Sequence, residues 1–294
     1  MWMILPPIEA DAATQMAIDA VLLDRCETDT NAGFIRFYRM TPPAVTIGRN
    51  QRWQKVIDPT ACQARGWAWV RRPTGGGALL HADEVNYAIA VGRRILKERG
   101  LSGFRSVFEW IAGGLADSVR SLGLQPIVSA GSRESMSRGR PGGTRQHGLC
   151  GKSLTQYEIA ESGRKLLASA QLLTSHGVLQ HGTIYLKAPG DTDRFWPKAL
   201  SINVLRTDAP QGIRPPRTET ATPRRETTGA SQRWTDLGPV AQDRTWEQIA
   251  AQLTAGLLEA LGLEPAEHPL SESDLRAVSA IRESWQIQGW HTRR

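Results

Sequence analysis

The sequence of 294 residues predicts an α+β fold in which a mixed, mainly antiparallel sheet packs against helices. Apolar residues recur at helical spacing in one early segment, and short strand-like runs then follow in two groups separated by a second helical pattern. Helical periodicity returns near the end of the chain. This order does not alternate strand with helix, as a doubly wound parallel sheet would, and it therefore favours α+β.

The first expected element is an amphipathic helix over residues 11–25, where Asp11 is a suitable N-cap and Met16, Ala20 and Leu23 recur at helical spacing. A second helix is expected over residues 104–122, whose apolar residues form one face. Strands are expected in the first half at residues 34–38, 44–47, 67–70 and 87–91.

The second half begins with three runs that are typical of consecutive antiparallel strands, at residues 157–160, 165–173 and 178–186. Helices are expected at residues 245–261 and 271–285, and Ser271 with Asp274 forms a capping-box-like pair at the start of the last helix. We expect a catalytic core at 1–206 with a flexible Arg/Gly loop at 131–148, a disordered linker or insertion at 207–235, and a C-terminal helical segment at 236–294.

The composition excludes several classes of protein. The net charge of +7 is concentrated in the Arg/Gly loop and in the Pro/Thr-rich linker, which argues against a folded nucleic-acid-binding face. No apolar run approaches the roughly 18 residues of a membrane helix, and the N-terminus lacks a basic secretory start, so we expect a cytoplasmic protein. Three scattered cysteines form no CxxC pair, and no cluster has zinc spacing, so we expect no metal.

The segment from Arg71 to His81, RRPTGGGALLH, is the most informative part of the sequence. The glycines Gly75, Gly76 and Gly77 let the backbone lie flat against a ligand, and the guanidinium groups of Arg71 and Arg72 suit a carboxylate or phosphate. The alternative is a glycine-rich turn with solvated arginines. The segment is not a Walker P-loop, because no Gly-Lys-Ser/Thr follows the glycines.

Together with its surroundings, this segment resembles the lipoate–protein ligase, biotin ligase and octanoyltransferase superfamily. The run RRPTGGGALLHADEVNYAIAV is similar to the signature of that superfamily, and FIRFYRMTPPAVTIGRNQ, ESGRKLLASAQ and GVLQHGTIYL are similar to other elements in the same order. The resemblance covers roughly residues 9–186 and implies a catalytic domain of the class II biotin/lipoate ligase type.

Cys150 favours the cysteine-dependent octanoyltransferase branch of that superfamily. It stands eight residues before Glu158, a spacing similar to that of the nucleophile in this branch. A thiolate needs nearby cations, and His147, Lys152 and Lys165 are candidates for that role. The alternative is an incidental surface cysteine. Cys26 and Cys62, which lie in expected helices, are interpreted as structural.

The resemblance assigns roles to further residues. Lys165 matches a family lysine and would stabilise the oxyanion at the acyl carbonyl, whereas a lone lysine on a strand would otherwise be solvent-facing. Substrate binding is assigned to Arg71, Arg72, the three glycines, His81, Ser169 and His181. For both histidines the alternative is a hydrogen-bonded structural residue.

The implied reaction transfers an octanoyl or lipoyl group from acyl-carrier protein to Cys150, and then to a lysine of a lipoyl-carrier domain. Such acceptors include the glycine cleavage H protein and the 2-oxoacid dehydrogenase E2 subunit. The reaction consumes no cofactor. The first alternative is an ATP-dependent lipoate–protein ligase, which would use ATP and Mg²⁺. The second is a non-catalytic member of the superfamily or an RNA binder.

Overall fold

The computed structural model describes residues 1–129, 158–187 and 235–292. Within these ranges nine strands form one sheet in the order β12-β1-β3-β7-β11-β10-β9-β8, and β2 adds to β3. Neighbours from β3 through β8 are antiparallel, whereas β1 runs parallel to β3 and β12, and β2 runs parallel to β3. The expected α+β fold with a mixed, mainly antiparallel sheet is therefore confirmed.

The strands of this sheet are β1 (Trp2–Ile4), β2 (Ile8–Ala10), β3 (Gly33–Met40), β7 (Glu84–Gly92), β8 (Ile127–Val128), β9 (Ile159–Glu161), β10 (Arg164–Leu173), β11 (Gly177–Tyr185) and β12 (Ala266–Glu267). The helices are α1 (Ala12–Thr28), α2 (Pro59–Gln63), α3 (Arg93–Glu98), α4 (Gly103–Arg120), α7 (Gly238–Ala241), α8 (Trp246–Leu261) and α9 (Glu272–Ile287), with short 3₁₀ turns η1 (Trp53–Lys55) and η5 (Trp290–Thr292).

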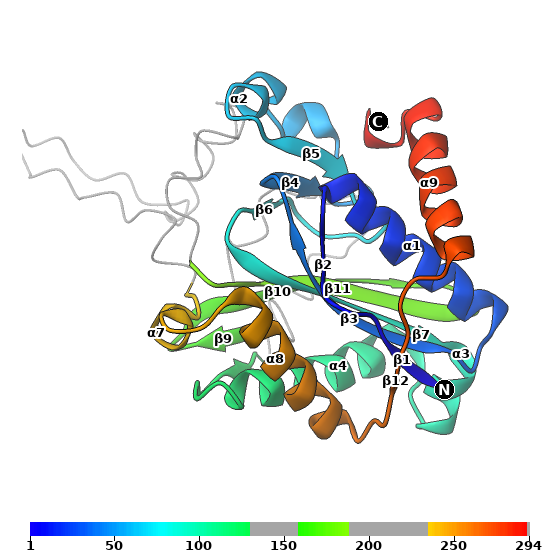
Figure 1. Ribbon diagram of the computed structural model, residues 1–294, viewed down its shortest axis with the longest axis vertical. Coiled ribbons are helices and arrows are strands. Elements are labelled where there is room, and N and C mark those ends of the chain that lie inside the picture. The colour runs from blue at the N-terminus through cyan, green and yellow to red at the C-terminus, as the bar shows by residue number, and fades with distance from the viewer. Residues whose placement is uncertain (130–157, 188–234, 293–294) are drawn as a thin grey trace, which may run out of the picture.

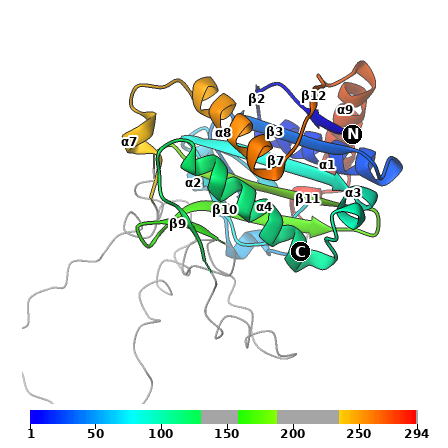
Figure 2. The same ribbon diagram turned by 90° about the horizontal axis from the view of Figure 1, so that it is seen from below.

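Two helical layers cover the large sheet. Helices α4 and α8 pack on one face, and α1 packs on the other with α9 outside it (Figure 1). Figure 2 shows α4 and α8 side by side across their face. The core beneath them contains Ile111 and Leu115 of α4 and Leu253 and Leu257 of α8, all completely buried. The C-terminal helices thus share a hydrophobic core with the sheet.

Helix α1 begins where the sequence predicts, because Asp11 caps it by accepting a hydrogen bond of 3.0 Å from the backbone N–H of Thr14. The expectation of an amphipathic helix was wrong. Helix α1 is buried on several sides, since it lies between the sheet and α9, and its buried residues include the polar Gln15 and Asp19. Each of these polar groups consequently needs a partner inside the protein.

The other predicted helices and strands are present among the described residues, with ends that differ from the prediction by at most three residues. Strands β9, β10 and β11 are consecutive and antiparallel, as expected. Ser162 and Gly163, both with positive φ, form the turn between β9 and β10. The capping boxes of α8 and α9 involve Thr245 and Ser271. The very short strands β1, β2, β8 and β12 were not predicted, because two or three residues are too few to show an alternation of apolar and polar side chains.

A small second sheet carries the glycine-rich segment. It has the order β5-β4-β6, from β4 (Ala44–Ile47), β5 (Ala68–Arg71) and β6 (Leu79–His81), with β4 parallel to β5 and antiparallel to β6. Because β4 and β5 are parallel, the loops that follow them leave the sheet at the same edge. These loops are residues 48–52 and 72–78. The arrangement brings Gly75–Gly77 next to the loop after β4.

The predicted Arg/Gly loop at 131–148, Cys150, and residues 207–234 of the predicted linker lie outside the described residues. In the ranges that are described, no helix is long and apolar enough to cross a membrane.

Candidate active site

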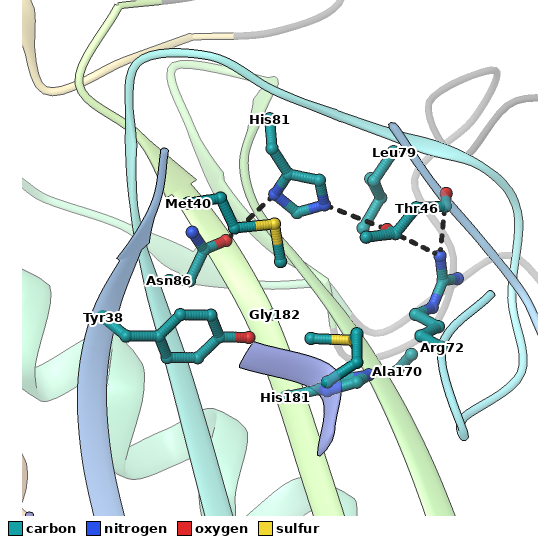
Figure 3. A pocket seen from close by; sticks show the side chains of 11 residues that line it. Tyr38, Met40, Thr46, Arg72, Leu79, His81, Asn86, Ala170, His181 and Gly182 are labelled. Carbon is teal, nitrogen blue, oxygen red and sulfur yellow. Dashed lines mark hydrogen bonds between the residues drawn. The ribbon is translucent and has the colours of Figure 1, made fainter. Parts of the chain in front are cut away.

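A small pocket lies between the small sheet, helix α1 and strands β3, β7, β10 and β11. Figure 3 shows its apolar lining together with two histidines and one arginine. The lining residues are Met16, Tyr38, Met40, Thr46, Arg72, Leu79, His81, Asn86, Ala170, His181 and Gly182. The pocket therefore unites three of the residues singled out from the sequence: Arg72, His81 and His181.

Arg72 organises the glycine loop. Its guanidinium Nη2 donates to the carbonyl oxygens of Gly75 and Gly77, each at 2.6 Å, and Nη1 donates to the hydroxyl of Thr46 at 3.2 Å. The side chain is buried, with 2% exposure of the residue. The glycine loop therefore curves around the guanidinium group of Arg72. The same side chain also lines the pocket (Figure 3).

Two positions in this region require glycine. Gly76 has φ of +88°, which an L side chain rarely adopts. A Cβ on Gly48 would lie 2.1 Å from the carbonyl oxygen of Gly76, so the loop after β4 and the glycine loop touch backbone to backbone. A Cβ built on Gly76 would lie 3.9 Å from the Cβ of Ala170, which lines the pocket. None of the three glycines Gly75–Gly77 lines the pocket itself, but this approach places Gly76 beside the lining residue Ala170, and their assignment to substrate binding stays a prediction.

His81 is held from both sides of its ring. Its Nε2 lies 2.9 Å from the hydroxyl of Thr46, and its Nδ1 lies 3.1 Å from Oδ1 of Asn86 and 3.3 Å from Oε1 of Glu84 (Figure 3). The ring is 4% exposed and lines the pocket. These contacts fix the orientation of the ring beside the pocket, and its assignment to substrate binding stays a prediction.

His181 is part of a buried polar network that the sequence did not predict. Its Nδ1 lies 2.7 Å from Oδ2 of Asp19, and its Nε2 lies 2.5 Å from Oγ1 of Thr74. Asp19 also accepts from Nη2 of Arg36 at 2.5 Å and from Nε at 2.9 Å. Arg36 and Asp19 are 1% and 0% exposed. The four residues come from α1, β3, β11 and the loop after β5, which only the fold brings together.

A signal for this network does exist in the sequence. Gln15 and Asp19 are four residues apart between apolar residues of the helix, and therefore share one face. Arg36 stands in the middle of the apolar strand Gly33–Met40. It donates to Oε1 of Gln15 at 2.7 Å as well as to Asp19. A charge inside an apolar run indicates a buried partner.

Arg71 does not line the pocket, and its guanidinium group bonds backbone carbonyl groups instead. Its Nη1 donates to the carbonyl oxygens of Gly48, Arg49 and Gln51 at 2.7–3.0 Å, and its Nε donates to that of Trp290 at 3.0 Å. In return, Nε1 of Trp290 donates to the carbonyl of Arg71 at 2.9 Å. Arg71 therefore joins the loop after β4 to the C-terminal turn η5, and its proposed contact with substrate remains untested.

Lys165 and Ser169 lie on β10 but outside the pocket lining. The ammonium of Lys165 donates to Oε1 of Glu158, and both residues are buried. Lys165 lies five residues before Ala170, which corresponds to about 16 Å along the strand. The hydroxyl of Ser169 lies 2.6 Å from that of Tyr87, on the face of the sheet that α4 and α8 cover. The structure thus separates these two residues from the histidines.

The two cysteines in the described ranges are ill-suited as nucleophiles. Cys26 in α1 and Cys62 in α2 are both buried. Burial raises the pKa of Cys26 to about 12 and that of Cys62 to about 11, so both remain thiols at neutral pH. Their interpretation as structural residues agrees with this burial. Across the same residues, no three His, Cys, Asp or Glu side chains are grouped so that they could hold a metal ion.

Acidification is expected to lower stability between pH 7.5 and 5.5. Burial lowers the pKa of His181 against the opposing pull of Asp19, and burial together with Arg71 lowers the pKa of His291. The unfolded chain binds more protons at these sites as the pH falls below about 6.5, so the free energy of unfolding decreases. Urea midpoints measured across this range test the sign. His291→Gln should flatten the dependence, whereas His176→Gln, at an exposed site, should not; an unchanged slope in His291→Gln would refute the assignment.

The fold and the glycine loop over a buried pocket define a catalytic domain of the lipoate-ligase type. The model of the lipoyl protein ligase A/B catalytic domain family matches residues 11–218, and the chain belongs to this family. The fold is similar to that of a lipoate–protein ligase A bound with ATP, with a TM-score of 0.69, 18% identity and 99% coverage of both chains. It is also similar to a bipartite lipoate protein ligase of Thermoplasma acidophilum, with a TM-score of 0.69, 16% identity and coverage of 99% and 95%.

Two curated relatives with the name octanoyltransferase LipM match the chain over its whole length, and a third matches about two thirds of it. The relative from Kyrpidia tusciae is 31% identical over 100% of this chain and 99% of its own. The relative from Symbiobacterium thermophilum is 28% identical over 100% and 98%. The relative from Moorella thermoacetica is 38% identical over 65% of this chain and 67% of its own.

Proposed function

We propose that this chain is an octanoyltransferase of protein lipoylation, which moves an octanoyl group from acyl-carrier protein to a lysine of a lipoyl-carrier domain. The observation that carries this proposal is the full-length similarity to relatives named octanoyltransferase LipM. The apolar lining of the pocket beside the glycine loop supports it, because an acyl chain is held by apolar side chains.

Cys150 is the proposed nucleophile. The Cys150 thiol ionises, its thiolate attacks the thioester carbonyl of the donor, and the bond between carbonyl carbon and donor sulfur breaks. The donor leaves as a thiolate and takes up the proton that Cys150 gave up. The deprotonated lysine amine of the acceptor then attacks the thioester on Cys150. A C–N bond forms, the bond to the Cys150 sulfur breaks, and the amine proton restores the thiol. The proposal keeps the cytoplasmic location expected from the sequence.

The surroundings of Lys165 support its part in this proposal. Cys150 stands eight residues before Glu158, which binds Lys165, so the chain leaving Cys150 enters the described structure beside this ammonium. An ammonium at the acyl carbonyl would stabilise the oxyanion in both steps. The acyl chain would then extend from Lys165 along β10 in the direction of Ala170 and the pocket.

Intact-mass spectrometry after incubation with octanoyl-acyl-carrier protein tests this function. We expect the mass of one octanoyl group to be added to the wild-type protein and to disappear on treatment with hydroxylamine, which cleaves thioesters. Cys150→Ala should abolish the addition, whereas Cys62→Ala should retain it, because that thiol is buried and protonated.

Two results would overturn the proposal. An unmodified wild-type protein that exchanges pyrophosphate into ATP when octanoate is present would identify a ligase instead. Full acyl loading of Cys150→Ala would place the nucleophile elsewhere.

A further inference from the structure

Asp19 is the centre of a buried chain of hydrogen bonds that the proposed chemistry does not use. Its Oδ1 accepts from Arg36, and its Oδ2 faces Nδ1 of His181 at 2.7 Å and also accepts a longer hydrogen bond of 3.5 Å from the hydroxyl of Tyr38. The guanidinium of Arg36 also lies over the ring of Tyr38, 3.9 Å from its centroid. Burial alone would raise the pKa of Asp19, but Arg36 and His181 outweigh it and hold that pKa below its ordinary value. Asp19 is therefore a carboxylate.

The charge of Asp19 fixes the tautomer of His181. A carboxylate can only accept, so Nδ1 of His181 carries the proton that faces it. Burial keeps the ring neutral at neutral pH by lowering its pKa, with Arg36 and Arg72 acting in the same direction against Asp19. Nε2 is then an acceptor, and the hydroxyl of Thr74, 2.5 Å away, must donate to it.

Thr74 links this chain of hydrogen bonds to the glycine loop. Its carbonyl oxygen accepts from the backbone N–H of Arg49 at 2.8 Å, and the next three residues are Gly75–Gly77. Arg72 holds the far part of the loop through the carbonyls of Gly75 and Gly77. The loop is thus tied at its start by Thr74 and along its length by Arg72. Glycines have the greatest backbone freedom of any residue, so the conformation depends on these ties.

We propose that Asp19 and His181 are positioning residues of the acyl-transfer site, which act through the hydroxyl of Thr74 to fix the glycine loop over the pocket. The inference rests on the proposed function, because it assumes that the acyl chain lies beneath this loop. His181 lines the pocket, and Gly76 lies beside Ala170, which also lines it. A loop that drifts by about 1 Å would misplace the acyl chain relative to the reacting carbonyl, and such shifts reduce rates by about 100-fold.

Single-turnover acylation by octanoyl-acyl-carrier protein in Thr74→Val and Thr74→Ser tests this inference. Valine keeps the shape of threonine without a hydroxyl, whereas serine keeps the hydroxyl. We expect the rate constant for acyl loading to fall about 10- to 100-fold in Thr74→Val and to stay within about threefold of wild type in Thr74→Ser. A purely structural role would reduce the fraction of protein that becomes acylated, through partial unfolding, and would leave the rate constant unchanged.

A Thr74→Val rate constant within about threefold of wild type would overturn the inference, as would an equal loss in both variants. If Thr74→Val does not fold, Thr74→Ala serves in the same comparison with Thr74→Ser. Failure of the proposed function is distinct, because the wild-type protein itself would then carry no octanoyl thioester. ¹⁵N NMR of the His181 ring gives a second readout: a proton on Nε2 in the wild-type protein would contradict the hydrogen-bond chain.

Discussion

Replacement of Arg36 by methionine is expected to lower the free energy of unfolding by about 3–5 kcal/mol, because it leaves the buried carboxylate of Asp19 without its cation. Both side chains are at most 1% exposed, so water cannot replace the lost bonds. The substitution also leaves Oε1 of Gln15 without this donor. Equilibrium unfolding in urea or guanidinium chloride measures the change, provided that the transition is two-state.

The same substitution at Arg39 is the matched control. Arg39 lies on the same strand β3, but its side chain is 34% exposed and its contacts with Glu9 and Asp83 are 3.9 and 3.7 Å long. Exposed pairs of this kind contribute roughly 0–1 kcal/mol, so Arg39→Met should change stability little. A loss in Arg36→Met no larger than that in Arg39→Met would mean that Asp19 is stabilised without Arg36.

Replacement of Lys165 by methionine is expected to reduce the rate of acyl transfer by about 100- to 1,000-fold, the usual cost of removing one donor to an oxyanion. The neighbouring Arg164 is exposed, and Arg164→Met should leave the rate unchanged within about threefold. Acyl loading measured by intact mass, at saturating donor, gives both rates.

A second variant separates the chemistry of Lys165 from its ion pair. Lys165→Met leaves Glu158 buried beside an apolar side chain, which alone would destabilise the protein. Adding Glu158→Gln removes that charge, so the double variant should recover stability but remain slow. Recovery of the transfer rate in the double variant would show that Lys165 acts only by neutralising Glu158.

The secondary-structure elements of this protein differ in how far they can be predicted from the sequence. Helix α1 and the antiparallel strands β9 to β11 follow from local patterns. The helix is specified by its capping residue Asp11 and by the spacing of its apolar residues, and the first strand pair by the turn at Ser162-Gly163. The two-residue strands β8 and β12 carry no such pattern. They form only because a neighbouring strand offers unpaired backbone groups.

Some features of the candidate site could likewise be predicted from the sequence, and others could not. The segment from Arg71 to His81 is contiguous, so its glycines and arginines could be recognised as a unit from the sequence alone. The opposite roles of the two adjacent arginines could not. Arg71 ends β5 and bonds the carbonyls of Gly48, Arg49 and Gln51, whereas Arg72 begins the loop and bonds the carbonyls of Gly75 and Gly77. Successive side chains of an extended backbone point in opposite directions.

The sequence by itself determined the family, the α+β class and the glycine-rich segment, because each of these is encoded in residues close together along the chain. Only the tertiary structure joined Asp19, Arg36, Thr74 and His181, which lie on four separate segments. These four residues meet only because the packed helices and strands bring their side chains within hydrogen-bonding distance. Their burial requires these contacts, since a charge removed from water needs a counter-charge within the protein.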